Sequence, residues 1–260
     1  MSFNIGDLVT RKSHNNDTVF FITDIVDDLY YLKGLNVRLV ADALGEDLVE
    51  YKDEDIEGES SFLERISNHD SLDRTDYFYL PGKILHIDGD SEYLKRCLKY
   101  YEDSNIWAMG ITEDEDNIPL KIKDWLEEYK PNIVIITGHD AYYKKKGRFD
   151  ELKAYKNSHN FIDAVKAART YEKEHDKLII IAGACQSNYE ELIKAGANFA
   201  SSPKRINIHA LDPAIVATNI SLSSASQDID LKSILDKTKY GPSGMGGIIT
   251  KGTMYIGYPR

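Results

Sequence analysis

The chain carries one pattern of apolar residues near its start and another over most of its length. Residues 1–52 hold short β-rich runs separated by Asn, Asp and Gly turns: FNIGDLVTRKS, TVFFITDIV, YYLKGL and VRLVADA. Runs of this length and spacing predict a small five-stranded, SH3-like β-barrel.

From about residue 79, nearly continuous Ile/Val runs alternate with amphipathic stretches. The predicted strands are GKILHIDGD, IWAMGITE, NIVIITGH and KLIIIAGAC, and the predicted helices are SEYLKRCLKYYEDS, PLKIKDWLEEYK, SHNFIDAVKAARTYEKEH and NYEELIKAGA. Ser91 is the expected N-cap of the first helix, Pro119 opens the second, and Gly196 closes the last. Strands that are apolar on both faces, with helices between them, predict a parallel sheet covered on both sides.

The two patterns are separated by a polar stretch. Residues 53–76 contain nine Asp/Glu, two Arg and few aliphatic residues, a composition typical of a solvated linker. We therefore expect a barrel over 1–52, an acidic linker over 53–78 and a three-layer α/β domain over 79–260. Residues 1–52 hold five Lys/Arg against nine Asp/Glu, so we expect this barrel to contact proteins.

Charge and composition narrow the class of protein. The net charge is −11 over 260 residues, which argues against a nucleic-acid partner, because such binding depends on Lys and Arg. No apolar run is long enough for a membrane span, and no signal peptide begins the chain, so we expect a cytoplasmic protein without a membrane partner. Cys97 and Cys185 are too few for a disulfide framework and show no zinc-ligand spacing. We expect no metal or organic cofactor.

Two reactive side chains follow consecutive predicted strands. His139 comes one residue after NIVIITG, and Cys185 ends LIIIAGAC, 46 positions later. The carboxyl ends of parallel strands meet at one edge of a sheet, so the imidazole can face the thiol, take its proton and later protonate a leaving amine. A helix starting near Ser187 would favour the thiolate, and the backbone N–H groups of Gly138 and Cys185 could form an oxyanion hole.

Each of these residues also has a structural interpretation. A cysteine after an aliphatic strand is often a small buried hydrophobic residue, and a histidine in a loop often makes a structural hydrogen bond. The two together, in register at consecutive strand ends and each flanked by glycine or a small residue, favour catalysis. His209, in NIHALDP, is a weaker candidate for the base, and Cys97 is expected in the core.

The order strand–His, then strand–Ala-Cys, resembles the caspase, gingipain and clostripain clan of cysteine peptidases. Longer segments resemble the YabG family of sporulation-specific proteases: GDLVTRKSHNNDTVFFI, YLKGLNVRLVADA, GACQSNYEELIKAGANFASSPKRINIHALDPAIVATNIS and GPSGMGGIITKGTMYIGYPR. The resemblance implies a caspase-like fold, a His139/Cys185 dyad and cleavage after Arg. It also implies substrates among spore coat and germination proteins, in the mother cell beside the forming coat.

A pocket for arginine requires a carboxylate, because a buried guanidinium without a partner is costly. Asp88 and Asp90 in HIDGD and Asp212 in HALDP are the candidates. Asp140 follows His139 where the clan usually has Gly. Asp140 could orient the imidazole or serve in a turn. Because it departs from the clan's pattern, the oxyanion contact that the clan makes from the residue after His does not carry over directly.

Three further features leave alternatives open. The basic loop YYKKKGRFD, residues 142–150, is either solvated or a site for acidic substrate segments. The glycine-rich tail lacks a phosphate-loop motif and is expected to form a loop and hairpin. Arg65 and Arg74 lie in the predicted linker, where self-cleavage would be easiest.

Two other functions compete with the endopeptidase. An amidase-like hydrolase would share the thiol, but its usual GxCxG elbow and later His do not match the order found here. A non-catalytic spore-coat assembly protein would use the barrel and linker as binding surfaces. Sensitivity to thiol alkylation would separate it from the peptidase.

Overall fold

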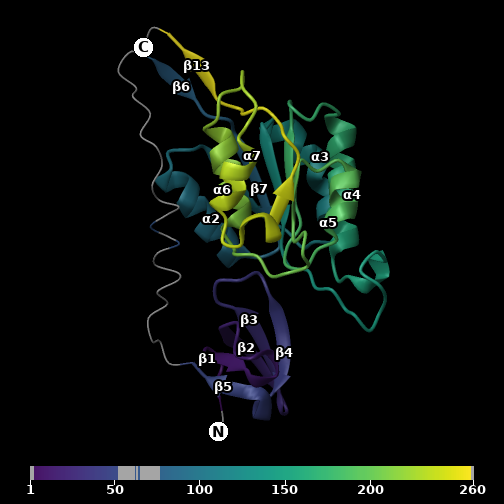
Figure 1. The fold of residues 1–260 in the computed structure, drawn as a ribbon. Coiled ribbons are helices and arrows are strands. Elements are labelled where there is room, and N and C mark those ends of the chain that lie inside the picture. Colours follow the sequence, from purple (N-terminus) through teal and green to yellow (C-terminus); the bar gives the residue numbers. More distant parts are fainter. Residues whose placement is uncertain (1–2, 52–61, 63, 65–76, 259–260) are drawn as a thin grey trace.

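The computed structural model describes residues 3–51, 62, 64 and 77–258. Two main sheets organise this part of the chain, and the smaller one lies below the larger in Figure 1. The fold is mixed α/β with one largely parallel sheet and two antiparallel sheets. The expected linker, with Arg65 and Arg74, lies almost entirely outside the described residues.

The smaller sheet is formed near the N-terminus by β1 (Leu8–Arg11), β2 (Phe20–Val26), β3 (Leu29–Gly34), β4 (Val40–Leu44) and β5 (Leu48–Glu50). All neighbours are antiparallel, in the order β4-β3-β2-β1-β5, and short 3₁₀ turns lie at Lys12–His14 and Gly45–Asp47. Val9, Phe20, Ile22 and Leu32 point inward and are fully or almost fully buried. Alternation of buried and exposed positions along β3 explains why this stretch forms a strand with one core-facing side.

The larger sheet has the order β12-β11-β10-β9-β7-β8. Its strands are β7 (Ile84–Asp88), β8 (Ala108–Thr112), β9 (Ile133–Thr137), β10 (Ile179–Ala182), β11 (Phe199–Ser201) and β12 (Met245–Gly247). All neighbouring pairs are parallel except β11 with β12. Every residue of β7, β9 and β10 is buried, as expected for strands covered on both faces.

Helices cover both faces of this sheet (Figure 1). One layer contains α3 (Ile118–Tyr129), α4 (Ser158–Tyr171) and α5 (Tyr189–Ala195), packed on alternate strand residues such as Val134 and Ile180. The other contains α2 (Ser91–Asp103), α6 (Asp212–Ser221) and α7 (Leu231–Asp236), whose apolar residues share a core with Ile133, Ile181 and the smaller sheet. Opposite faces of each strand therefore support separate layers.

The residues expected at the ends of the helices were predicted correctly in part. Pro119 lies in the first turn of α3, and Gly196 closes α5 in a left-handed conformation, both as expected. The N-cap of α2 is Asp90 and not Ser91, because the Asp90 carboxylate accepts the N–H groups of Glu92 and Tyr93.

The expected hairpin in the tail was wrong. After a 3₁₀ turn at Gly241–Ser243, β12 pairs with β11, whereas β13 (Tyr255–Gly257) pairs with the distant β6 (Phe78–Leu80). The tail therefore completes two different sheets. A remaining 3₁₀ turn, Leu152–Ala154, lies in the loop between β9 and α4.

Candidate active site

The carboxyl ends of three neighbouring strands carry candidate residues of the site: Asp88 for substrate binding, and His139 and Cys185 for catalysis. β7 ends at Asp88, β9 is followed by His139, and β10 is followed by Cys185. β9 pairs in parallel with both β7 and β10, so these ends lie side by side. The sheet therefore brings a carboxylate, an imidazole and a thiol to one edge.

Backbone and side-chain contacts hold His139 in place. Its N–H donates to Oε1 of Glu115 at 2.8 Å, and its carbonyl accepts from the side-chain amide of Asn157 at 2.8 Å. A Cβ at Gly138 would lie 2.5 Å from the same Glu115 oxygen, so glycine there permits the close approach. The ring packs edge-on against Tyr93, with centroids 5.7 Å apart.

The orientation of the imidazole follows from Asp90. Nε2 of His139 lies 3.0 Å from Oδ2 of Asp90, and the same carboxylate oxygen lies 2.6 Å from Nζ of Lys33 on β3. Burial alone would raise the pKa of Asp90, but hydrogen bonds from His139 and Lys33 lower it well below its usual range. An ionised Asp90 can only accept a hydrogen bond, so Nε2 of His139 carries the hydrogen between them. Nδ1 is buried and has no hydrogen-bond partner among the described residues.

Cys185 lies in a tight turn between β10 and α5. Gly183 has φ +100°, Gln186 has φ +58°, and the Oγ of Ser187 accepts the N–H of Ala184. The thiol is fully buried, and the N–H of Ile208 points at its sulfur from 3.3 Å. Burial raises the pKa of the thiol to about 12, despite opposing effects from the N–H groups of Ile208 and Arg38. The sulfur is therefore a neutral thiol in this conformation, and no hydrogen bond joins it to His139 in the described part of the chain.

Asp88 holds a buried guanidinium. Nη1 of Arg38, a residue between β3 and β4, lies 2.6 Å from Oδ2 of Asp88, and both side chains are fully buried. Nη2 and Nε of Arg38 donate to the carbonyl of Ala210 at 2.6 and 3.0 Å, and the Tyr93 ring lies 5.2 Å from the guanidinium carbon. Burial alone would raise the pKa of Asp88, but the Arg38 charge and His86 lower it. Asp88, Ala210 and Tyr93 therefore surround the guanidinium of Arg38.

The other candidate carboxylates have different contacts. Asp212 accepts the N–H groups of His209 and Lys239, both at 2.8 Å, at the start of α6. Asp140 accepts the N–H groups of Ala141 and Asn157 and the hydroxyls of Ser158 and Ser187. Asp140 therefore ties the loop after β9 to the turn after β10, and among the described residues its carboxylate makes no hydrogen bond to the His139 ring.

His209 and Cys97 are part of the supporting structure. Nδ1 of His209 accepts the N–H of Leu211, and its backbone forms an isolated antiparallel bridge with Val37. Cys97 is fully buried on α2, as expected, and its sulfur lies 3.5 Å from Nη2 of Arg38.

Four residues of the site were missed from the sequence: Lys33, Arg38, Tyr93 and Glu115. Lys33 lies on β3, and nothing local indicates that it meets the larger sheet. A signal did exist for Tyr93, because it lies in the first turn of a helix that starts at the carboxyl edge. A signal also existed for Arg38, in the loop after β3, because it is a single charge within the otherwise apolar run VRLV.

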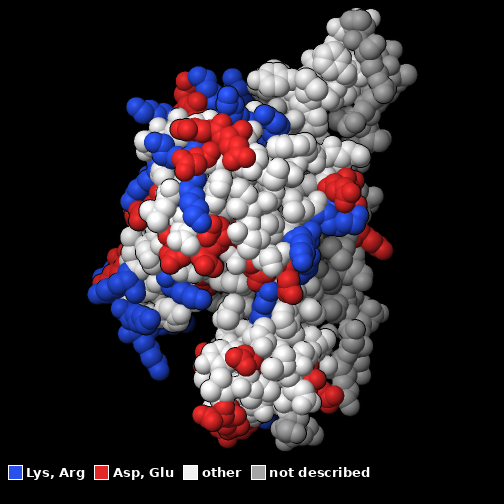
Figure 2. All heavy atoms as spheres, turned by 180° about the vertical axis from the view of Figure 1, so that it is seen from behind, with Lys and Arg blue, Asp and Glu red and all other residues white. Residues whose placement is uncertain are grey.

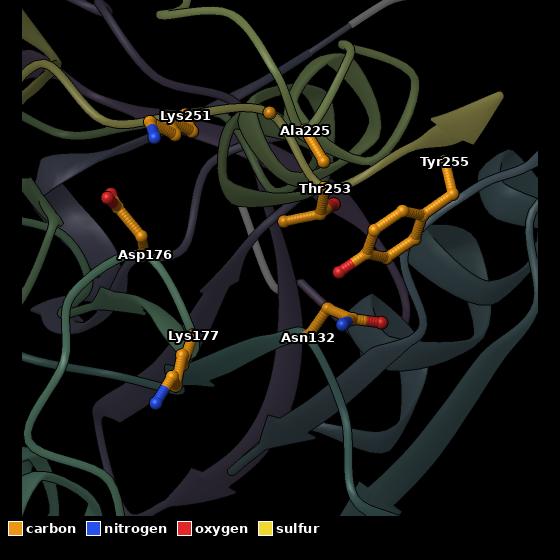
Figure 3. A pocket seen from close by; sticks show the side chains of 8 residues that line it. Asn132, Asp176, Lys177, Ala225, Lys251, Thr253 and Tyr255 are labelled. Atoms are coloured by element: carbon orange, nitrogen blue, oxygen red, sulfur yellow. The ribbon is translucent and has the colours of Figure 1, made fainter.

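Two surface features lie away from these residues. Lys and Arg side chains gather on the loop that projects beyond α4 (Figure 2), where Lys144, Lys145, Lys146 and Arg148 are exposed. A pocket of about 380 Å³ lies near the amino ends of β9 and β10, lined by Asn132, Asp176, Lys177, Lys251 and Tyr255 among others (Figure 3). Its lining contains neither Cys nor His, and among the described residues no three His, Cys, Asp or Glu side chains are placed to hold a metal ion.

The sequence of the chain is similar to that of known peptidases. A family of peptidases, described as YabG peptidase U57, matches residues 4–259. The chain belongs to this family. It is 41% identical to the sporulation-specific protease YabG of Bacillus subtilis (strain 168), in an alignment that covers 100% of this chain and 99% of that protein. The family supports a sporulation peptidase, and no helix within the described ranges is long and apolar enough to cross a membrane.

Proposed function

We propose that this peptidase is a cysteine endopeptidase in which Cys185 is the nucleophile, His139 the general base, and Asp88 the carboxylate that selects arginine before the scissile bond. The observation that carries the proposal is the buried Asp88–Arg38 pair beside His139 and Cys185. This pair supports the proposal, because it holds a guanidinium at the same edge of the sheet as the thiol and the imidazole.

The chemistry follows from the orientation of His139. Nδ1 takes the proton of Cys185, and the thiolate attacks the carbonyl carbon of the substrate arginine to form a tetrahedral intermediate. Backbone N–H groups of Gly138 and Cys185 stabilise its oxyanion. The imidazolium then protonates the leaving amine as the C–N bond breaks, which leaves a thioester. Water, deprotonated by His139, attacks the thioester, and the thiol regains its proton.

The pocket favours arginine over lysine. Three guanidinium nitrogens of Arg38 each make a short contact, to Asp88 or to Ala210. A lysine ammonium on an unbranched stem would leave part of this acceptor set unpaired in a buried site, which costs about 1–3 kcal/mol. We expect cleavage after arginine to exceed cleavage after lysine by about tenfold or more.

The topology supports a caspase-like assignment. When the six strands of the larger sheet are numbered in chain order from β7, they lie side by side in the order 2-1-3-4-5-6. The proposed base follows the third of these strands, and the proposed nucleophile follows the fourth. We propose that residues 79–260 form a caspase-like peptidase domain, residues 1–52 an SH3-like barrel, and residues 53–78 the linker.

The substrates we propose are proteins of the spore coat and germination apparatus, cleaved in the mother cell beside the forming coat. The relative is named a sporulation-specific protease, which supports the setting. The exposed lysines of residues 142–150 would attract acidic segments of such substrates. The chain itself is a further substrate, through Arg65 or Arg74.

The test is a peptide library that presents each residue type before the scissile bond. Wild-type protein should cleave after Arg, and Cys185→Ala and His139→Ala should each lower kcat/KM by about 10³-fold or more. Asp88→Asn should lower kcat/KM for Arg peptides strongly and reduce the preference over Lys, whereas Asp212→Asn is the matched carboxylate control. Cleavage that survives Cys185→Ala would overturn the dyad, and an Arg preference that survives Asp88→Asn would overturn the pocket.

A further inference from the structure

The loop of residues 34–39, between β3 and β4, inserts an arginine into the pocket described above. Arg38 is fully buried although it belongs to the smaller sheet's sequence, and its guanidinium reaches Asp88 and Ala210 of the other part of the chain. Burying a cation is costly unless a charged partner and hydrogen bonds compensate it. Asp88 and the carbonyl of Ala210 supply both.

The backbone of this loop pairs with residues 208–210 at one isolated bridge. The N–H of Arg38 donates to the carbonyl of Ile208 at 3.3 Å, the N–H of Ala210 donates to the carbonyl of Asn36 at 3.1 Å, and Val37 and His209 form an antiparallel bridge. In peptide recognition, main-chain hydrogen bonds of this kind supply affinity and side-chain pockets supply specificity.

The paired segment also lies against the nucleophile. Ile208, whose carbonyl accepts from Arg38, directs its own N–H at the sulfur of Cys185. The charge and the backbone N–H of Arg38 both oppose the rise of the Cys185 pKa. Arg38 therefore places its guanidinium on Asp88 and its backbone N–H on Ile208, the residue whose own N–H contacts the thiol. A substrate residue before the scissile bond would have to occupy the same neighbourhood.

Side chains of α2 fasten both ends of the loop. Oη of Tyr93 lies 2.6 Å from the carbonyl oxygen of Gly34 and 2.8 Å from that of Val37. Arg96 donates to the carbonyl of Leu35 at 2.9 Å and to the side chain of Asn36 at 3.1 Å. These contacts seat the loop, and Cys185 is fully buried in this conformation.

We propose that residues 34–39 are a substrate-like inhibitory segment, in which Arg38 occupies the arginine pocket and covers Cys185, so that this conformation is the latent form of the peptidase. An arginine-containing protein substrate must displace the segment before it can bind. This inference rests on the proposed function, because it takes the Asp88 pocket as the substrate site.

The test compares wild-type protein with Arg38→Ala. Removal of the guanidinium empties the pocket, so kcat/KM for a short peptide cleaved after Arg should rise about tenfold or more, as when a minor competent state becomes dominant. The rate at which iodoacetamide modifies Cys185, followed by mass spectrometry of the Cys185 peptide, should rise in parallel. A fall in both rates would overturn the proposal and make Arg38 a structural residue.

Arg11→Ala is the matched control. It removes an arginine from the same sheet, one that stacks on Phe20 at 5.2 Å and makes no contact with the pocket. Both rates should stay at the wild-type value. Equal increases in the two variants would show that general loosening of the smaller sheet, and not the emptied pocket, activates the enzyme.

A second variant keeps the proposal testable if Arg38→Ala does not fold. Arg96→Ala removes two contacts that hold the loop but leaves the buried Asp88–Arg38 pair intact. It should raise the alkylation rate of Cys185 and kcat/KM by a smaller factor. Wild-type rates in a folded Arg96→Ala protein would count against a displaceable loop.

The outcomes separate this inference from the function on which it rests. If no variant cleaves after Arg, or if cleavage persists in Cys185→Ala, the proposed function fails. If wild-type protein cleaves after Arg through Cys185 and Arg38→Ala is no faster, only the inhibitory segment fails. Intact mass adds one more outcome: complete cleavage of the wild-type chain between Arg38 and Leu39 would make the segment a substrate and overturn its inhibitory role.

Discussion

At the scale of single residues, the most informative contact is that of Arg38 with Asp88. Both side chains are fully buried, and each would be strongly unfavourable without the other. Asp140 is also a buried carboxylate, and it depends on the hydrogen bonds that it accepts from two N–H groups and two hydroxyls. Such groups link segments that are distant in sequence, so their replacement should lower the free energy of unfolding by a measurable amount.

The Asp88–Arg38 pair predicts a pH dependence of stability. The pKa of Asp88 is lowered in the folded protein, so its stabilising contribution is present above the ordinary carboxyl pKa and is lost as pH falls through the lowered value. Arg38→Met should lower the free energy of unfolding by about 3 kcal/mol at pH 7. The difference from wild type should shrink below about pH 4. Urea unfolding at pH 7 and pH 3 measures it, Arg11→Met is the control, and a difference independent of pH would contradict the expectation.

Asp140→Asn should destabilise the protein and lower kcat. The variant amide presents N–H groups where two serine hydroxyls now donate, so about 1–3 kcal/mol of unfolding free energy should be lost. The loops that carry His139 and Cys185 would also lose their common anchor. Asp163→Asn, an exposed residue paired with Lys166, should change stability by less than about 0.5 kcal/mol. Comparable effects in both variants would show that Asp140 has no special positioning role.

At the scale of elements, the turn from β10 into α5 determines where the thiol points. Gly183 has a left-handed conformation at φ +100°, and a Cβ there would lie 2.8 Å from Cδ1 of Leu192 on α5. The turn is therefore constrained both by backbone conformation and by packing. The strands themselves determine the position of the thiol less closely than this turn does, because their Ile/Val runs set only their burial and direction.

Gly183→Ala should destabilise the protein more than Gly6→Ala, although both glycines have a positive φ and so a similar backbone cost. Gly6 also has positive φ, +94°, but nothing lies within 4 Å of the added Cβ. Gly6→Ala should cost about 1 kcal/mol, and Gly183→Ala should cost about 1–3 kcal/mol more because of overpacking against Leu192. Thermal unfolding of both variants tests this, with kcat/KM reduced only for Gly183→Ala. Equal losses would show that the packing contribution is negligible.

At the scale of the whole molecule, the smaller sheet lies at the carboxyl edge of the larger one and completes the site. Lys33 binds the carboxylate that orients His139, and Arg38 binds Asp88 at the end of β7. The two sheets also share one apolar core. The N-terminal strands thus contribute residues to the candidate site.

Hydrogen exchange should report displacement of this loop. In wild-type protein the N–H groups of Arg38 and Ala210 are hydrogen-bonded between the loop of residues 34–39 and residues 208–210 and should exchange slowly. Covalent labelling of Cys185 with a thiol-reactive peptide that carries arginine should accelerate exchange over residues 36–38. The same reagent with norleucine in place of arginine is the control. Unchanged protection after complete labelling would mean that ligand and loop occupy different places.

Much of this protein followed from its sequence alone. The Ile/Val runs of β7, β9 and β10 predicted buried parallel strands, because only strands covered on both faces are apolar throughout. Parallel direction then placed Asp88, His139 and Cys185 at one edge. The five-stranded antiparallel sheet near the N-terminus also followed from its short runs and turns.

Tertiary structure alone decided which side chains meet at that edge. Asp90 was considered for the arginine pocket, but as the N-cap of α2 it turns toward His139, whereas Asp88 faces Arg38. Arg38 and Lys33 reach the site across two sheets, and β13 pairs with a strand more than a hundred residues away in sequence. Contacts of this kind depend on how separate elements pack. Periodicity and turn signals describe only neighbours along the chain, so they carry no information about such contacts.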